Sequence, residues 1–166
     1  NPCAAASRYM SFSGELWGIG HGAFLVRCTA AGKSYFQRGS GYPGKNVRTL
    51  SRDSAGTVWS VDYSGVYMLS KGATRFRPFK GASKKIVDVV SEPAHKRVWF
   101  LHRDLGVYLR QGTKRRHFFL EELQYARTMA LDPRGNIWVG GDSGISVIHK
   151  VGATWKTTNK YLTKRT

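Results

Sequence analysis

The chain has 166 residues, the size of one domain and enough to bury a sizeable core. Lys and Arg number 27 against 10 Asp and Glu, so the formal net charge of +17 favours acidic proteins, nucleic acids or anionic polymers as partners. No apolar run approaches 18 residues, so the sequence predicts no membrane-spanning helix.

An internal repeat of about 40 residues runs along the chain. Its most regular marker is a tryptophan, found at Trp17, Trp59, Trp99 and Trp138. A turn glycine follows each tryptophan, and a second glycine precedes a strand-like stretch; these stretches are KSYFQR, ATRFRPF, TKRRHFF and ATWKTTN. We therefore expect four copies, over residues 8–46, 47–85, 86–126 and 127–160.

Within each copy the sequence predicts four short strands. In the second copy they are VRTLS, TVWSV, VYMLS and TRFRPF, joined by RDSAG, DYSG and KGA. The strands are rich in β-branched and aromatic residues, and no helical period extends over ten residues. The fourth copy repeats the pattern, with the turns DPRG and GGDSG on either side of Ile137-Trp138-Val139.

Four-stranded units at this period are typical of propeller blades. We expect an all-β fold, a small β-propeller of four four-stranded antiparallel blades, and one domain over residues 1–166. The set closes as a ring by itself, belongs to a longer array, or pairs with another chain. We assign the four tryptophans to the core between blades, because each Trp can bury roughly 150–250 Å².

Two segments resemble the two-component-regulator propeller repeat, which carries D-x-x-G-x-(I/L/V)-W. They are GYPGKNVRTLSRDSAGTVWSVDYSGVYML and ARTMALDPRGNIWVGGDSGISVI. The matching residues are Gly41, Pro43, Asn46, Val47, Asp53, Gly56 and Trp59 in the second copy, and Asp132, Gly135, Ile137 and Trp138 in the fourth. The resemblance implies the propeller fold and, as one possible function, ligand sensing or scaffolding for a signalling receptor. The resemblance does not decide the function, because propeller folds support many different functions.

Two cysteines and the first residue indicate export. The sequence begins at Asn1 rather than Met, as after signal-peptide removal, so we expect a periplasmic or secreted protein. Cys3 and Cys28 lack metal-type spacing, and we expect a disulfide between them. Two buried thiols in a reducing compartment are the alternative.

Basic residues concentrate on the fourth strands and the turns before them. They are Lys71, Arg75, Arg77 and Lys80 in the second copy, and Arg110, Lys114, Arg115 and Arg116 in the third. Charges on an edge strand discourage pairing with other chains, but this does not explain the excess of one sign. Binding of nucleic acid or another polyanion is an alternative, although no recognition motif supports it.

Catalytic motifs are missing from the sequence. There is no G-x-S-x-G, no H-E-x-x-H and no phosphate-binding glycine loop at a helix start. The histidines lie in different copies without a repeating partner. We expect a non-enzymatic protein without cofactor or metal; a lyase or hydrolase on one propeller face is the alternative.

A partner-binding surface is expected where the loops between strands 2 and 3 share one end of the blades with the blade-connecting segments. Tyr, Arg and His side chains there suit a protein interface. The candidate residues are His21, Tyr42, Lys45, Asp62, Tyr63, Ser64, His102, Arg103, Asp104, Glu122, Tyr125, Asp142 and Ser143.

Protein binding is therefore the function that the sequence favours, as a monomer or in a heteromeric complex. A short, free-standing, exported propeller is similar to small inhibitor or immunity proteins of bacterial envelope hydrolases. That similarity implies a partner whose active site is occluded, namely a toxic cell-wall hydrolase.

Overall fold

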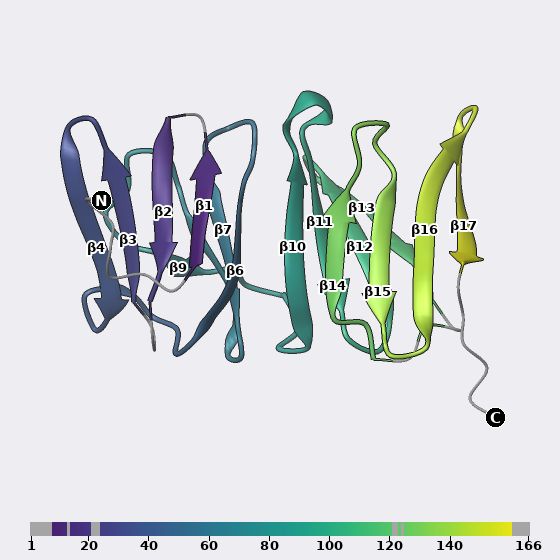
Figure 1. Ribbon diagram of the computed structural model, residues 1–166, viewed down its shortest axis with the longest axis horizontal. Helices are drawn as coiled ribbons and strands as arrows, with labels where there is room; N and C mark the ends of the chain where they lie inside the picture. The colour runs from purple at the N-terminus through teal and green to yellow at the C-terminus, as the bar shows by residue number, and fades with distance from the viewer. Residues whose placement is uncertain (1–7, 13, 21–23, 121–122, 124, 161–166) are drawn as a thin grey trace. The chain divides into compact units, whose positions relative to one another are not determined.

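The computed structural model describes residues 8–12, 14–20, 24–120, 123 and 125–160 (Figure 1). Most of the described residues lie in β-strands, which form four antiparallel sheets that we call blades 1 to 4. No helix in the described ranges is long and apolar enough to span a membrane.

Each blade takes its strands in sequence order. Blade 1 has β1 (Arg8–Phe12), β2 (Glu15–Ile19), β3 (Leu25–Thr29) and β4 (Gly32–Arg38), with the short β5 (Gly41–Tyr42) added parallel to β4. Blade 2 has β6 (Val47–Arg52), β7 (Val58–Asp62), β8 (Gly65–Leu69) and β9 (Arg77–Pro78). Blade 3 has β10 (Ile86–Glu92), the 3₁₀ turn η1 (Pro93–His95), β11 (Arg97–His102), β12 (Gly106–Gln111) and β13 (Lys114–Phe118). Blade 4 has β14 (Thr128–Leu131), β15 (Ile137–Gly141), β16 (Gly144–Val151) and β17 (Thr154–Lys160).

The predicted fold class is confirmed, since the structure contains four four-stranded antiparallel sheets of propeller type. The strand composition follows the burial pattern. Every residue of β7 and β11 is buried, and both strands are largely apolar, whereas the outer strand β13 is exposed at Lys114, Arg115 and Arg116.

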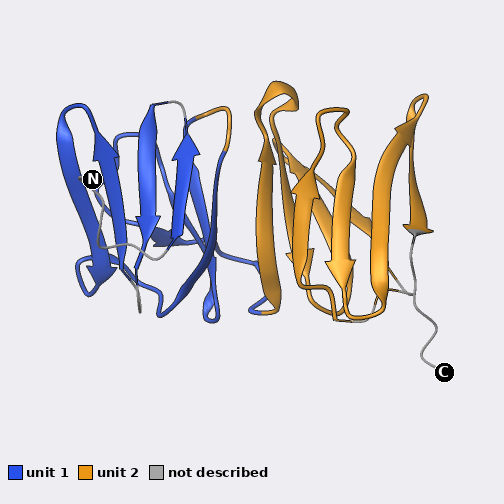
Figure 2. Cartoon of the chain, viewed as in Figure 1, with its two compact units in different colours: residues 1–52, 56–84 blue, residues 53–55, 85–166 orange. Residues whose placement is uncertain are grey.

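The chain divides into two compact units of two blades each (Figure 2). Unit 1 comprises residues 1–52 and 56–84, and unit 2 comprises residues 53–55 and 85–166. Unit 1 ends at residue 84, within one residue of the expected end of the second repeat. That all four blades form one domain stays a prediction.

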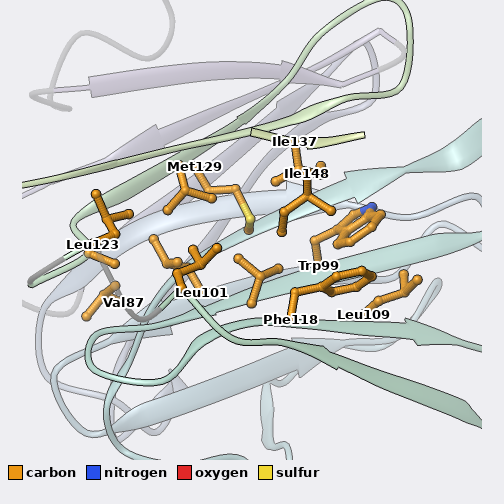
Figure 3. Close-up of a cluster of buried hydrophobic side chains, with 13 residues drawn as sticks. Val87, Trp99, Leu101, Leu109, Phe118, Leu123, Met129, Ile137 and Ile148 are labelled. Atoms are coloured by element: carbon orange, nitrogen blue, oxygen red, sulfur yellow. The ribbon is translucent and has the colours of Figure 1, made fainter. Parts of the chain in front are cut away.

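Each unit has its own aromatic-rich core. In unit 1, the Trp17 ring stacks on Phe36 at 5.5 Å between ring centroids, and Phe76 meets both rings edge-on. In unit 2, Trp99 packs against Phe118 and Trp155, with ring centroids 5.7 and 5.1 Å away. Figure 3 shows Trp99 and Phe118 beside aliphatic side chains from blades 3 and 4. The two blades of a unit therefore share one hydrophobic core.

The first strands of blades 2 and 3 contain a register shift at the same place. In β6 the shift falls between Val47 and Thr49, and in β10 between Ile86 and Asp88. An extra residue in one strand of an antiparallel pair bends the strand and changes the direction of a side chain. Arg48 in β6 and Val87 in β10 are the extra residues at these two shifts.

The fourth strand of blade 2 is much shorter than the sequence predicts. TRFRPF was expected to be a strand, but the strand covers only Arg77–Pro78, followed by a bond from Phe79 N–H to the Val66 oxygen at 2.8 Å. Phe76 leaves the sheet because its ring is buried in the core of unit 1 and its backbone N–H donates to the Gly41 oxygen at 2.7 Å. Burial of this ring and the bond to β5 replace further pairing with β8.

Candidate partner-binding face

The turns between the second and third strands contact the blade-connecting segments, as the blade topology requires. In unit 2, Arg103 N–H donates to the Lys85 oxygen, and Ala126 N–H donates to the Arg103 oxygen, both at 3.0 Å. In unit 1, Lys45 N–H donates to Asp62 Oδ2 at 2.7 Å. We call these surfaces the loop face of unit 1 (residues 41–46, 48 and 63–64) and the loop face of unit 2 (residues 103–105, 125–127 and 142–143).

Asp62 is a structural residue of the unit 1 loop face. It is 1% exposed, and Oδ1 accepts hydrogen bonds from Ser64 N–H, Ser64 Oγ–H and Gly65 N–H at 2.6–3.0 Å. Oδ2 accepts from Lys45 N–H and, at 3.4 Å, from the Tyr42 hydroxyl. The expected exposure of Asp62 is therefore wrong: its carboxylate closes the turn and fixes the connector.

Tyr42 is also buried, contrary to the expectation that it lies on the surface. Its hydroxyl lies 2.8 Å from Ser60 Oγ, and its ring packs against Tyr67 and Phe76. Burial raises the pKa of the Tyr42 hydroxyl, so it stays neutral and acts as a hydrogen-bonding core residue.

Tyr63 projects from the same turn and is 65% exposed. The Arg48 guanidinium lies 5.2 Å from the centre of its ring, within the range of a cation–π interaction. Arg48 is the residue at the register shift of β6, which explains how a strand residue reaches the turn. Lys45 is exposed and Ser64 is half-buried.

His102 is the counterpart of Asp62 in blade 3. It is 4% exposed, so its expected exposure is wrong as well. Its Nδ1 accepts from the backbone N–H groups of Asp104 and Leu105, both at 3.2 Å. Burial lowers the pKa of His102, consistent with a neutral ring whose Nδ1 is an acceptor.

Arg103 and Tyr125 are exposed on the unit 2 loop face, and Tyr125 is 60% exposed. The bond from Ala126 N–H to the Arg103 oxygen fixes the two backbones next to each other. Tyr125 has a φ of 47°, a left-handed conformation that non-glycine residues seldom adopt. An arginine therefore accompanies an exposed tyrosine on each of the two loop faces.

The remaining candidates on unit 2 form ion pairs at the surface. Asp104 accepts from Lys85 Nζ at 2.7 Å, and this bond lowers the pKa of Asp104. The Asp142 carboxylate accepts from Arg127 Nε and, at 2.9 Å, from the Arg127 terminal nitrogen. Ser143 is half-buried.

Three predicted residues, Cys3, His21 and Glu122, lie outside the described residues. Cys28 is buried in β3 with 8% exposure. The disulfide between Cys3 and Cys28 stays a prediction.

Trp17, Trp59 and Trp99 are buried, at most 3% exposed, and Trp17 and Trp99 belong to the shared cores of units 1 and 2. Trp138 is only half-buried, so it is not a fully enclosed core residue. In blades 1, 3 and 4 a tryptophan indole N–H donates to a carboxylate at 3.0–3.2 Å. The pairs are Trp17 with Glu15, Trp99 with Glu92, and Trp138 with Asp132. Sequence reasoning missed these acceptors; the Asp132 of the D-x-x-G-x-I-W segment was the available signal.

Among the described residues, no group of three His, Cys, Asp or Glu side chains could hold a metal ion. The two loop faces instead combine buried acceptors, which fix the turns, with exposed Tyr and Arg side chains. The four blades and their closed turns define a protein of propeller-repeat fold.

The comparisons with known proteins support this class, although no family model matches the chain. A curated relative, the photosystem II assembly lipoprotein Ycf48 of Prochlorococcus marinus, is 28% identical over 141 residues, covering 80% of this chain and 41% of the relative. The chain thus spans less than half of that protein.

Two solved structures share the fold. The extracellular domain of the putative hybrid two component system BT4673 from B. thetaiotaomicron has a TM-score of 0.69 and 16% identity, over 91% of this chain and 24% of the other. YCF48 bound to D1 peptide has a TM-score of 0.58 and 17% identity, over 89% of this chain and 50% of the other. The predicted resemblance to regulator propellers is thus confirmed at the level of structure.

Proposed function

We propose that the chain is a non-enzymatic propeller that binds another protein through its loop faces. The observation that carries the proposal is the exposed Tyr63 ring with the Arg48 guanidinium 5.2 Å from its centre, on a turn held by the buried Asp62. Tyr and Arg dominate the binding energy of many protein interfaces, and a rigid turn loses little entropy on binding.

The unit 2 loop face supports the same proposal. Tyr125 and Arg103 have exposed side chains. Their backbones are held together because Ala126 N–H, next to Tyr125, donates to the Arg103 oxygen. A YCF48 that is 17% identical to this chain has been solved with a D1 peptide bound, so a propeller of similar fold takes a polypeptide ligand.

A narrower form of the proposal names the partner as a toxic cell-wall hydrolase of the bacterial envelope. It rests on the expected export and on the missing catalytic motifs of the sequence. No residue of either loop face is specific to such a partner. A sensing role is the second candidate, favoured by the structural similarity to the extracellular domain of a two component system.

The test uses the full chain as bait in an envelope extract, with a wash at about 0.5 M salt to remove contacts that depend only on exposed charge. Parallel baits carry Tyr63→Asp or Arg103→Asp. We expect at least one protein to survive the wash on the wild-type bait and to be lost from one or both variants, with unchanged melting temperatures.

Matched controls are Tyr35→Asp and Arg115→Asp, which change exposed residues of the outer strands β4 and β13. These baits should retain the protein. Equal retention on loop-face and control baits would contradict the assignment of the loop faces, and elution of every protein by salt would contradict specific protein binding.

A further inference from the structure

A groove lies beside the shortened outer strand of blade 2, entirely within unit 1. It has a volume of about 1020 Å³, and its lining includes β5 and most of the segment from Met68 to Lys80. Ala73 N–H donates to the Ser70 oxygen at 2.9 Å, and Phe79 N–H donates to the Val66 oxygen at 2.8 Å. These bonds use main-chain groups beside the groove, so we assign recognition of a ligand to the side chains.

Phe76 anchors the stretch of chain that carries two cations of the groove. Its side chain is 4% exposed, and its ring meets Trp17 and Phe36 edge-on in the core of unit 1. Arg75 and Arg77 flank it, and both are exposed. Because the buried ring fixes the chain between them, the two guanidinium groups start from a backbone that is already in place.

The groove is cationic. Arg75, Arg77 and Lys80 line it, all three are exposed, and no Asp or Glu is among the described residues of its lining. A concave surface with charges of one sign concentrates the electric field and raises the local concentration of anions. Ser70 and Thr74, which are also exposed, add hydroxyl donors to the same lining. The groove therefore favours an anionic ligand with several oxygen acceptors.

The chemistry of the lining favours phosphate groups without bases. A guanidinium group binds phosphate through two parallel hydrogen bonds, and a lysine adds a point charge. Bases of single-stranded nucleic acids stack on exposed aromatic rings, whereas the large rings of the described lining, Tyr42 and Phe76, are buried. A volume of about 1020 Å³ exceeds what one phosphate fills, so several linked phosphates suit the groove better than a single ion.

We propose that this groove binds a linear polymer of phosphate groups that carries no bases. Arg75, Arg77 and Lys80 neutralise successive phosphates, and the counterions released from the polymer contribute to the affinity. The groove borders the loop face of unit 1 at residues 41–43, but none of its cations belongs to that face. The site is therefore separate from protein binding by the loop faces.

The test measures binding of a short, fluorescein-labelled linear polyphosphate to the full chain, by fluorescence anisotropy over a series of salt concentrations. The groove variant is Arg75→Gln/Arg77→Gln/Lys80→Gln. The control is Lys114→Gln/Arg115→Gln/Arg116→Gln on β13, where all three cations are exposed. Each variant loses two arginines and one lysine, so the two have the same net charge, and both should melt at the wild-type temperature.

We expect the groove variant to weaken binding by a factor on the order of ten or more, and the control by a factor of about three or less, because distant charges are screened. The salt dependence of the groove variant should also be shallower, since fewer counterions are released. Tyr63→Asp should bind polyphosphate as the wild type does, so failure of the groove and failure of the loop faces are distinguishable. An equal loss in both triple variants, or no binding by the wild type, would overturn the proposal.

Three further measurements test the place and the kind of ligand. Thr74→Asp keeps the three cations and puts a carboxylate into the groove, so it should weaken binding; unchanged affinity would contradict the position of the polymer. A single-stranded oligothymidylate of equal charge should bind more weakly, and tighter binding that the groove variant abolishes would assign the groove to nucleic acid instead. Polyglutamate of equal charge should also bind more weakly, and equal or tighter binding would overturn the preference for phosphate.

Discussion

Asp62 and His102 occupy the same position in blades 2 and 3 and have the same role. Each is the last residue of the second strand, pairs with the first residue of the first strand, and is buried. Each accepts hydrogen bonds from the backbone N–H groups two and three residues further on. The Asp62 side chain closes one turn and the His102 imidazole the other, and burial lowers the pKa of His102.

Replacing Asp62 should destabilise unit 1. Asp62→Ala leaves the N–H groups of Lys45, Ser64 and Gly65 without their acceptor, so we expect a loss of about 2–4 kcal/mol in the free energy of unfolding. Urea titration followed by tryptophan fluorescence measures it. Asp142→Ala removes an exposed ion pair and should change the midpoint little. Similar midpoints for the two variants would contradict the structural role of Asp62.

Gly44 is the position of the connector that tolerates no side chain. A Cβ there would lie 1.8 Å from Asp62 Oδ2 and 2.5 Å from the Tyr42 ring. We expect Gly44→Ala to cost about 1–3 kcal/mol, because the buried carboxylate must move. Gly140→Ala is the control, since its Cβ would meet only Thr128 Cγ2, at 3.4 Å. A melting temperature for Gly44→Ala equal to that of the control would refute the close approach.

Stability should rise with pH because of His102. Burial lowers the pKa of His102 in the folded chain, whereas in the unfolded chain it is close to the ordinary value of 6.5. As the pH falls below about 6.5, the unfolded chain takes up a proton that the folded chain does not, so stability is lost until the folded pKa is reached. Above about 6.5 the contribution is complete.

The measurement compares urea unfolding at about pH 5 and about pH 7.5 for the wild type and His102→Asn. Asn supplies an acceptor that does not titrate, so the variant should lose less stability on acidification. If both proteins lose the same amount, another group is responsible.

Asp132 provides a spectroscopic test of the turn before Trp138. Burial by itself would raise its pKa, but bonds from the Trp138 indole, the Asn136 backbone and side chain and the Arg134 backbone lower the pKa to about 2. Titration of the carboxyl carbon by NMR should give this value, and Trp138→Phe should raise it. The contribution of Asp132 to stability is present above the ordinary value of 3.8 and falls as the pH approaches 2. A value unchanged by Trp138→Phe would contradict the role of the indole.

The predicted disulfide can be tested by mass spectrometry. If Cys3 and Cys28 are joined, iodoacetamide should alkylate the denatured chain only after reduction. Loss of a link of this length should lower stability by about 3 kcal/mol. Alkylation of both residues without a reductant would refute the pairing.

The sequence predicted the blades well because a packing requirement repeats in it. A tryptophan on each second strand and a glycine at each following turn recur with the blade period, so β6, β10 and β14 begin within one residue of the expected repeat boundaries. The exposure of the loop residues was harder to predict. Asp62 and Tyr63 are adjacent polar residues in one turn, yet one is 1% and the other 65% exposed.

The bond that buries Asp62 comes from Lys45, 17 residues earlier, and the turn sequence alone does not contain this contact. The same limit applies to β9. TRFRPF has the pattern of a strand, but Phe76 is buried against Trp17 and Phe36 of blade 1, and β9 begins only at Arg77.

The shared cores limit how blades can be gained or lost in evolution. Because the aromatic cluster of each unit draws on both of its blades, deletion of one blade would leave Trp17 or Trp99 facing water. Recombination that adds or removes blades should therefore be tolerated best in pairs. The smallest exchangeable part of this chain is two repeats, about 80 residues, although the sequence motif is half that length.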